Sequence, residues 1–139
     1  MFAPQCAKAL GARVIAPTFS ATKAKAPDAE VFKLTNGRGV DRVVEVGGTS
    51  TVRSIKSTNI SGRVMLVGMG GKAGTISPLL MAGGNVSLQA VAVGGRRHLE
   101  DSFAAVDMHR IRPIIDRVFP FEQGKDAYRY LQSRAHVRN

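Results

Sequence analysis

Residues 34–48 read Leu-Thr-Asn-Gly-Arg-Gly-Val-Asp-Arg-Val-Val-Glu-Val-Gly-Gly, and this stretch decides the fold class of the chain. Asn36 and Gly37 favour the left-handed backbone conformation that ends a helix. The β-branched run from Val40 to Val46 then predicts a buried strand, which stops at two adjacent glycines. In parallel α/β sheets ligands bind beyond the carboxyl ends of the strands, where bare glycine backbone permits close approach. The stretch therefore predicts part of a nucleotide-binding α/β domain, with a glycine-rich turn that binds no ligand as the alternative.

Periodicity and turn residues predict alternating helices and strands along the rest of the chain. Helices are predicted at residues 4–10, 29–35, 51–60, 77–81, 98–109 and 122–133, strands at 13–16, 40–46, 63–67 and 86–93, and an extended segment at 113–121. The clearest helix is the one at 98–109, because Leu99, Phe103 and Val106 recur at the spacing of an apolar stripe.

Length and composition are those of one ordinary globular domain. The chain has 139 residues, 44% of them hydrophobic, and no run approaches the roughly 18 apolar residues of a membrane span. Cys6 is the single cysteine, so no internal disulfide can form. A cytoplasmic location without membrane attachment is the expectation.

The net charge of +10, from 20 Lys and Arg against 10 Asp and Glu, opens a second reading as a nucleic-acid-binding protein. Against it, the cations are scattered along the chain, with Arg96 and Arg97 the one adjacent pair, and tryptophan is absent from the sequence. We therefore expect contact with nucleic acid to be non-specific.

Four segments of the sequence, the first of them within the stretch already described, occur in a characteristic order. They are residues 37–48, the Gly-Arg-Val-Met-Leu-Val-Gly segment at 62–68, Pro-Leu-Leu-Met at 78–81, and Arg-Pro-Ile-Ile-Asp-Arg-Val-Phe-Pro-Phe at 112–121. Together they resemble the cofactor domain of the zinc-type alcohol dehydrogenases and quinone reductases, in the medium-chain dehydrogenase/reductase superfamily. The resemblance covers nearly the whole chain. It implies a Rossmann domain that binds NAD or NADP, and a separate domain that holds the substrate and usually zinc.

The sequence departs from this family pattern in three places. The family's first strand and its Gly-x-Gly-x-x-Gly loop, which receives the cofactor pyrophosphate, should precede Ala7. Between Thr18 and Asp41 there is too little chain for the expected helix, strand and helix. After His136 the family continues into a strand that returns to the catalytic domain. The expectation is therefore a truncated, Rossmann-like parallel sheet flanked by helices, with the strands equivalent to 1 and 3 missing and the remaining four in the order 2-4-5-6.

The resemblance places the cofactor against main chain at three strand ends. The positions matching the family's fourth strand, against the adenosine side of the cofactor, are Val46, Gly47 and Gly48. The positions matching its fifth and sixth strands, where family members hold the nicotinamide carboxamide, are Val67, Gly68, Met69, Val91 and Val93. The alternative is that these valines are simply core residues of strands.

Cofactor choice in the family depends on the end of the second strand, where NAD-preferring members place an acid. No acid occurs here before Asp28, whereas Ser20 and Lys23 are placed to contact a 2′-phosphate. These two residues favour NADP, unless they are solvated loop residues. Binding is expected to be weak, because the pyrophosphate loop is missing.

No catalytic residue is predicted from the sequence. The histidines are too far apart for a zinc site and Cys6 has no partner, so no zinc is expected in this fragment. The histidines are His98, His109 and His136. Glu45, flanked by valines, is a candidate for a perturbed carboxylate, or for an ion pair with a base such as Arg63.

The function implied by the resemblance is that of an oxidoreductase, whose intact relatives transfer hydride between nicotinamide and an alcohol, aldehyde or enone. The fragment itself is expected to be inactive, with residues 1–112 as a partial dinucleotide-binding domain and 113–139 as a segment directed to the catalytic domain. A non-catalytic dimerising remnant is the alternative. A homodimer is expected through residues 86–93, an edge strand that lacks charge and proline.

Overall fold

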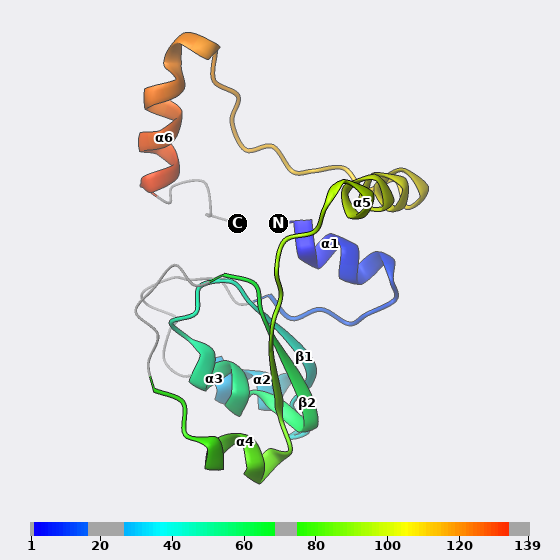
Figure 1. Ribbon diagram of the computed structural model, residues 1–139, viewed down its shortest axis with the longest axis vertical. Helices are drawn as coiled ribbons and strands as arrows, with labels where there is room; N and C mark the ends of the chain where they lie inside the picture. Colours follow the sequence, from blue (N-terminus) through cyan, green and yellow to red (C-terminus); the bar gives the residue numbers. More distant parts are fainter. Residues whose placement is uncertain (1, 17–26, 69–74, 134–139) are drawn as a thin grey trace. The chain divides into compact units, whose positions relative to one another are not determined.

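The computed structural model describes residues 2–16, 27–68 and 75–133, which belong to two compact units (Figure 1). One unit is Ala21–Gly94 and contains the sheet; the other combines Met1–Ser20 with Gly95–Asn139. Within the described ranges no helix has the length and apolar character needed to cross a membrane.

The sheet unit alternates helices and strands along the chain. Its elements are α2 (Pro27–Leu34), β1 (Val40–Glu45), α3 (Thr51–Lys56), β2 (Thr58–Leu66), α4 (Pro78–Gly84) and β3 (Ser87–Ala90). The strands form a parallel three-stranded sheet in the order β1-β2-β3. Helix α3 packs on β1 and β2, α4 packs on β2, and α2 packs against α3, as Figure 1 shows. The predicted α/β class, with a parallel sheet flanked by helices, is confirmed.

The core of this unit lies between the sheet and the helices α3 and α4. Val64 in β2 is fully buried and packs with Ile55 of α3 and with Val86. Val43 and Leu88 occupy the register positions beside Val64 on the two neighbouring strands, so one face of the sheet carries three apolar side chains in a row. Apolar burial on this face fixes the register, because a shift by one residue would turn these side chains to the opposite face.

The opposite face of the sheet carries charged side chains. Arg42 and Arg63 are register partners on β1 and β2, and both are exposed. They alternate with the core residues Val43 and Val64, as the two-residue period of a strand requires.

The chain enters the sheet through the turn predicted from the opening stretch. Asn36 and Gly37 have φ angles of 53° and 81°, and the Gly37 N–H donates to the Phe32 carbonyl at 2.7 Å. A residue in the left-handed region after a helix satisfies the last free carbonyls in this way. The predicted helix end is therefore confirmed.

One predicted strand is absent, and one predicted helix is shorter than expected. Residues 13–16 form no strand and belong to the other compact unit, so the sheet has three strands in place of the expected four. An apolar run becomes a strand only where its backbone groups find a paired neighbour. The helix predicted to reach Ile60 ends at Lys56, because the Thr58 hydroxyl donates to the Ile55 carbonyl at 2.7 Å and β2 begins at that residue.

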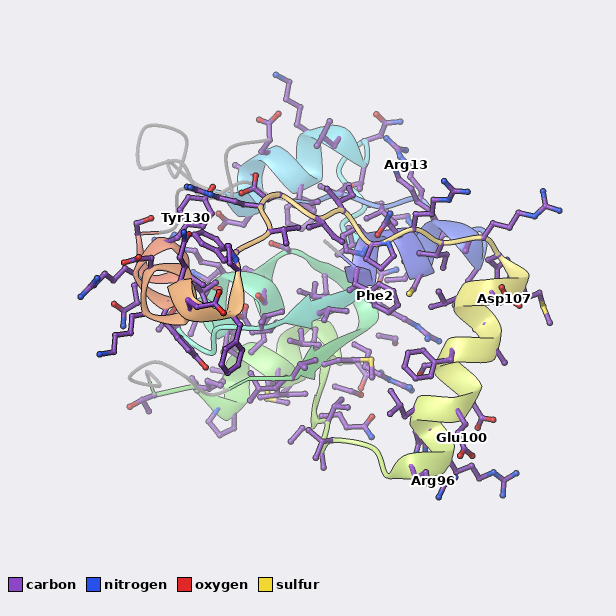
Figure 2. The ribbon with its side chains drawn as sticks, turned by 90° about the horizontal axis from the view of Figure 1, so that it is seen from above. Phe2, Arg13, Arg96, Glu100, Asp107 and Tyr130 are labelled. Atoms are coloured by element: carbon purple, nitrogen blue, oxygen red, sulfur yellow. The ribbon has the colours of Figure 1, made fainter. Side chains whose placement is uncertain are left out.

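The second unit is helical in its described part. Its elements are α1 (Phe2–Ala9), α5 (Arg96–Met108), the short 3-10 helix η1 (Phe121–Gln123) and α6 (Gly124–Gln132). Figure 2 shows Arg96 and Glu100 near the start of α5, where they form an exposed ion pair with an N–O distance of 2.7 Å. Residues 111–120 have no regular secondary structure, in keeping with the predicted extended segment.

Side chains tie the segments of this helical unit together. The Gln5 amide donates to the Arg112 carbonyl at 2.9 Å, which connects α1 with the segment after α5. The Tyr130 hydroxyl of α6 donates to Asp116 at 2.6 Å, and the guanidinium of Arg117 lies over the Tyr130 ring. The cation, the ring and the carboxylate therefore anchor α6 to the extended segment.

Candidate functional site

The three strands of the sheet end side by side, and their carboxyl ends form a continuous edge. The Val67 N–H donates to the Glu45 carbonyl at 2.9 Å, and the Val91 N–H donates to the Leu66 carbonyl at 2.9 Å. The backbone ladder therefore runs one residue past β2 and β3 and holds the chain at 67 and 91 in place. In open α/β sheets this edge is where ligands bind. We call residues 46–48, 67–68 and 91 the carboxyl edge.

The turn after β2 fits closely against the turn after β1. A Cβ atom added to Gly68 would lie 2.1 Å from the carbonyl oxygen of Val46. No side chain fits in that space, because the obstructing atom belongs to the backbone. Glycine at 68 is therefore required by the contact between the two turns.

The turn after β1 is organised by Glu45, whose side chain is 5% exposed. Its Oε1 accepts hydrogen bonds from the N–H groups of Gly47 and Gly48, at 3.2 and 3.0 Å. Its Oε2 accepts hydrogen bonds from the hydroxyls of Ser50, at 2.8 Å, and Ser54, at 2.5 Å. One carboxylate thus connects the strand, the turn and the first turns of α3.

These contacts determine the charge state of Glu45. Burial opposes ionisation and is the strongest single influence on the carboxyl group, but the hydrogen bonds from Ser54, Ser50, Gly48 and Gly47 act together in the other direction. The net effect lowers the pKa of Glu45 below its usual value of 4.5. Glu45 is therefore a carboxylate at neutral pH.

The expected ion pair between Glu45 and Arg63 is not formed. Glu45 points to the face of the sheet that packs on α3, whereas Arg63 lies in register with Arg42 on the opposite face. The strand period places the two side chains on opposite sides of the sheet, so they do not meet. Sequence reasoning identified the perturbed carboxylate but missed Ser50 and Ser54. The one signal for them was the recurrence of two serines four residues apart after the Gly-Gly pair.

The structure brings six of the predicted cofactor positions together at the carboxyl edge. These are Val46, Gly47, Gly48, Val67, Gly68 and Val91. Val46 and Val67 are 67% and 51% exposed, so at these two positions the valines are not core residues. Val93 is 98% exposed and lies beyond the ladder. Met69, Ser20 and Lys23 lie outside the described residues, so their predicted contacts stay predictions.

Metal ligands do not gather in the described ranges: no three His, Cys, Asp or Glu side chains come together there. His98 lies in the exposed first turn of α5, and His109 follows the end of that helix. No zinc chemistry is therefore derived from these residues, and elemental analysis remains the test of the predicted absence of zinc.

Comparison with known proteins places this geometry in a family. The sequence model of the zinc-binding dehydrogenases matches residues 10–137. A zinc-type alcohol dehydrogenase-like protein of Schizosaccharomyces pombe is 35% identical over 112 residues, which are 76% of this chain and 32% of that protein.

Solved structures agree with the family match. A candidate alcohol dehydrogenase from Sinorhizobium meliloti 1021 is 28% identical with a TM-score of 0.83, over 93% of this chain and 43% of that one. The mycobacterial protein Rv1454c, solved in complex with NADPH, is 26% identical with a TM-score of 0.76, over 94% of this chain and 49% of that one. The chain thus spans about a third to a half of the length of these relatives.

Proposed function

This chain belongs to the zinc-binding dehydrogenase family, and we propose that its carboxyl edge binds part of a nicotinamide dinucleotide. The observation that carries the proposal is the continuous edge itself, where Val67 and Val91 extend the backbone ladder and Gly68 lies against Val46. Where side chains at the ends of parallel strands are short, a ligand such as a nucleotide can lie close to the backbone. The NADPH complex of Rv1454c supports this choice of ligand.

The parts of the ligand follow the order of the strands. Residues 46–48 would hold the adenosine side, and residues 67–68 and 91 would hold the nicotinamide carboxamide. In longer relatives the nicotinamide would exchange hydride with an alcohol, aldehyde or enone. In this chain the Gly-x-Gly-x-x-Gly loop does not occur among the 139 residues, so affinity would be low and no turnover is proposed. A cytoplasmic location is part of the same proposal.

Calorimetric titration of the full chain with NADPH tests the proposal. We expect a dissociation constant weaker than about 1 µM, corresponding to less than about 8 kcal/mol of binding free energy. Val67→Asp should weaken binding at least about tenfold, because it places a carboxylate at the exposed edge close to an anionic ligand.

The matched control for Val67→Asp is Ile60→Asp. Ile60 lies near the other end of β2 and is 81% exposed, so the same charge there should leave NADPH affinity unchanged. Absence of binding at millimolar NADPH, or equal loss in both variants, contradicts the proposal. A dissociation constant well below 1 µM would show that the missing loop is not needed.

A preference for NADP through Ser20 and Lys23 would appear in Lys23→Ala as a loss of affinity that is larger for NADPH than for NADH.

A second role, homodimerisation, is favoured by the position of β3 at the edge of the sheet. We propose that residues 86–93 pair with their counterparts in a second copy, since an unpaired parallel edge offers free backbone donors and acceptors. The Val91 N–H points to β2, and because N–H groups along a strand point alternately to its two sides, the Ala90 N–H points to the open edge.

Ala90→Pro therefore removes an outward donor without removing a bond to β2. We expect light scattering to show a dimer for the unmodified chain and a monomer for Ala90→Pro. Gln89→Ala, which keeps every backbone donor, should stay dimeric. A monomeric unmodified chain at tens of micromolar would rule out this interface.

A further inference from the structure

The glycine turn after β1 differs from a phosphate-binding turn in the direction of its N–H groups. Turns between a strand and a helix bind phosphate when successive backbone N–H groups point outward. In this chain the N–H groups of Gly47 and Gly48 both donate to Glu45 Oε1. The two donors that a phosphate would need are therefore already occupied within the protein.

The negative charge of the Glu45 carboxylate, which lies beneath the turn, also disfavours phosphate binding. Glu45 is 5% exposed and, in the described part of the chain, none of the ion pairs involves it. Its partners here are neutral hydroxyl and amide groups, so no cation of residues 2–16, 27–68 or 75–133 forms an ion pair with the carboxylate. A phosphate at the turn would meet this charge at short range through a poorly solvated medium.

We propose that Glu45 sets the ligand chemistry of the Gly47–Gly48 turn: it occupies both glycine N–H groups and supplies a buried negative charge, so that the turn excludes phosphate and receives an uncharged group. Under the proposed function, on which this last step rests, that group is the ribose or base of the dinucleotide. The pyrophosphate must then be held elsewhere. Glu45 acts as a specificity-determining residue through the turn, without touching the ligand.

Nuclear magnetic resonance of the full chain tests this, with inorganic phosphate as the probe and the amide signals of Gly47 and Gly48 as the readout. In the unmodified protein we expect phosphate to leave both signals in place. Glu45→Ala frees the two donors and removes the charge, so phosphate should shift both signals and bind at least about tenfold more tightly than in the unmodified protein. Phosphate-dependent shifts of these two amide signals in the unmodified protein overturn the proposal. A folded Glu45→Ala variant whose two amide signals do not respond to phosphate also overturns it.

Glu30→Ala is the matched control, because it removes one acid from the exposed surface of α2 and changes the net charge equally. It should not create a phosphate response at the turn; such a response would show that net charge alone excludes phosphate.

If Glu45→Ala fails to fold, the unmodified protein still decides the question. Titration of the Glu45 carboxyl should move both glycine amide protons with the same midpoint, and an independent midpoint would overturn the proposal.

NADPH separates this inference from the proposed function. If NADPH shifts no signal at Val67 or Val91 while the phosphate experiments give the expected results, the proposed function fails and the role of Glu45 stands. If NADPH binds at the carboxyl edge while phosphate also shifts the amide signals of Gly47 and Gly48 in the unmodified protein, the proposed function stands and the role of Glu45 fails.

Discussion

The turns after β1 and β2 both contain glycine at the carboxyl edge, but they use it differently. After β2, Gly68 is required because a Cβ would collide with the Val46 carbonyl oxygen at 2.1 Å. After β1, a Cβ on Gly47 would have its nearest neighbour, the Thr49 hydroxyl, at 3.7 Å, an ordinary contact. The β1 turn is held by hydrogen bonds to Glu45, and the β2 turn by close packing. Two similar glycine signals in a sequence can therefore have different physical causes.

The largest effect on stability should come from Gly68→Ala. The added methyl group meets backbone, which cannot move without disturbing the ladder at Val67, so we expect a loss of about 3 kcal/mol in the free energy of unfolding. Gly47→Ala should change it by less than about 1 kcal/mol, since the added methyl group would make only ordinary van der Waals contacts. Urea denaturation of both variants measures the difference. Equal losses would show that the two turns do not differ in this way.

A smaller loss is expected for Glu45→Ala. The two glycine N–H groups and the hydroxyls of Ser50 and Ser54 lose their common acceptor, and some regain water. We expect a loss of about 2 kcal/mol, with Glu45→Gln closer to the unmodified protein because its side-chain oxygen can still accept from the turn. Urea denaturation at neutral pH checks this order. A Glu45→Ala as stable as the unmodified chain would mean that packing alone holds the β1 turn.

The smallest expected effect is on the loss of folding stability at low pH. Folding lowers the pKa of Glu45 below 4.5, so folding favours the carboxylate. The stability that Glu45 contributes is then fully present above its ordinary pKa and is lost as the pH falls through the lowered pKa in the folded state. Between about pH 6 and about pH 3, the unmodified chain should lose more stability than Glu45→Gln, which cannot titrate. If the free energy of unfolding depends on pH in the same way in both proteins, Glu45 does not contribute to the loss of stability in acid.

Local features of the sequence predicted much of the fold. The β-branched run at 40–46 predicts β1, and the apolar spacing of Leu99, Phe103 and Val106 predicts α5; both are confirmed. Asn36 and Gly37 indicated the helix end correctly, because a left-handed backbone preference belongs to the residue itself. The strand expected at 13–16 failed because strand formation needs a partner that local pattern does not reveal.

The sequence by itself determined the α/β class, the family and the glycine positions along the carboxyl edge, because periodicity, turn preference and motif order are properties of short segments. Only the tertiary structure decided what Glu45 and Gly68 do. Ser50 and Ser54 reach Glu45 because α3 packs back over β1, and Gly68 meets Val46 because β1 and β2 are neighbours. Such contacts depend on how separate elements pack in space, and the spacing of residues along the chain does not specify that.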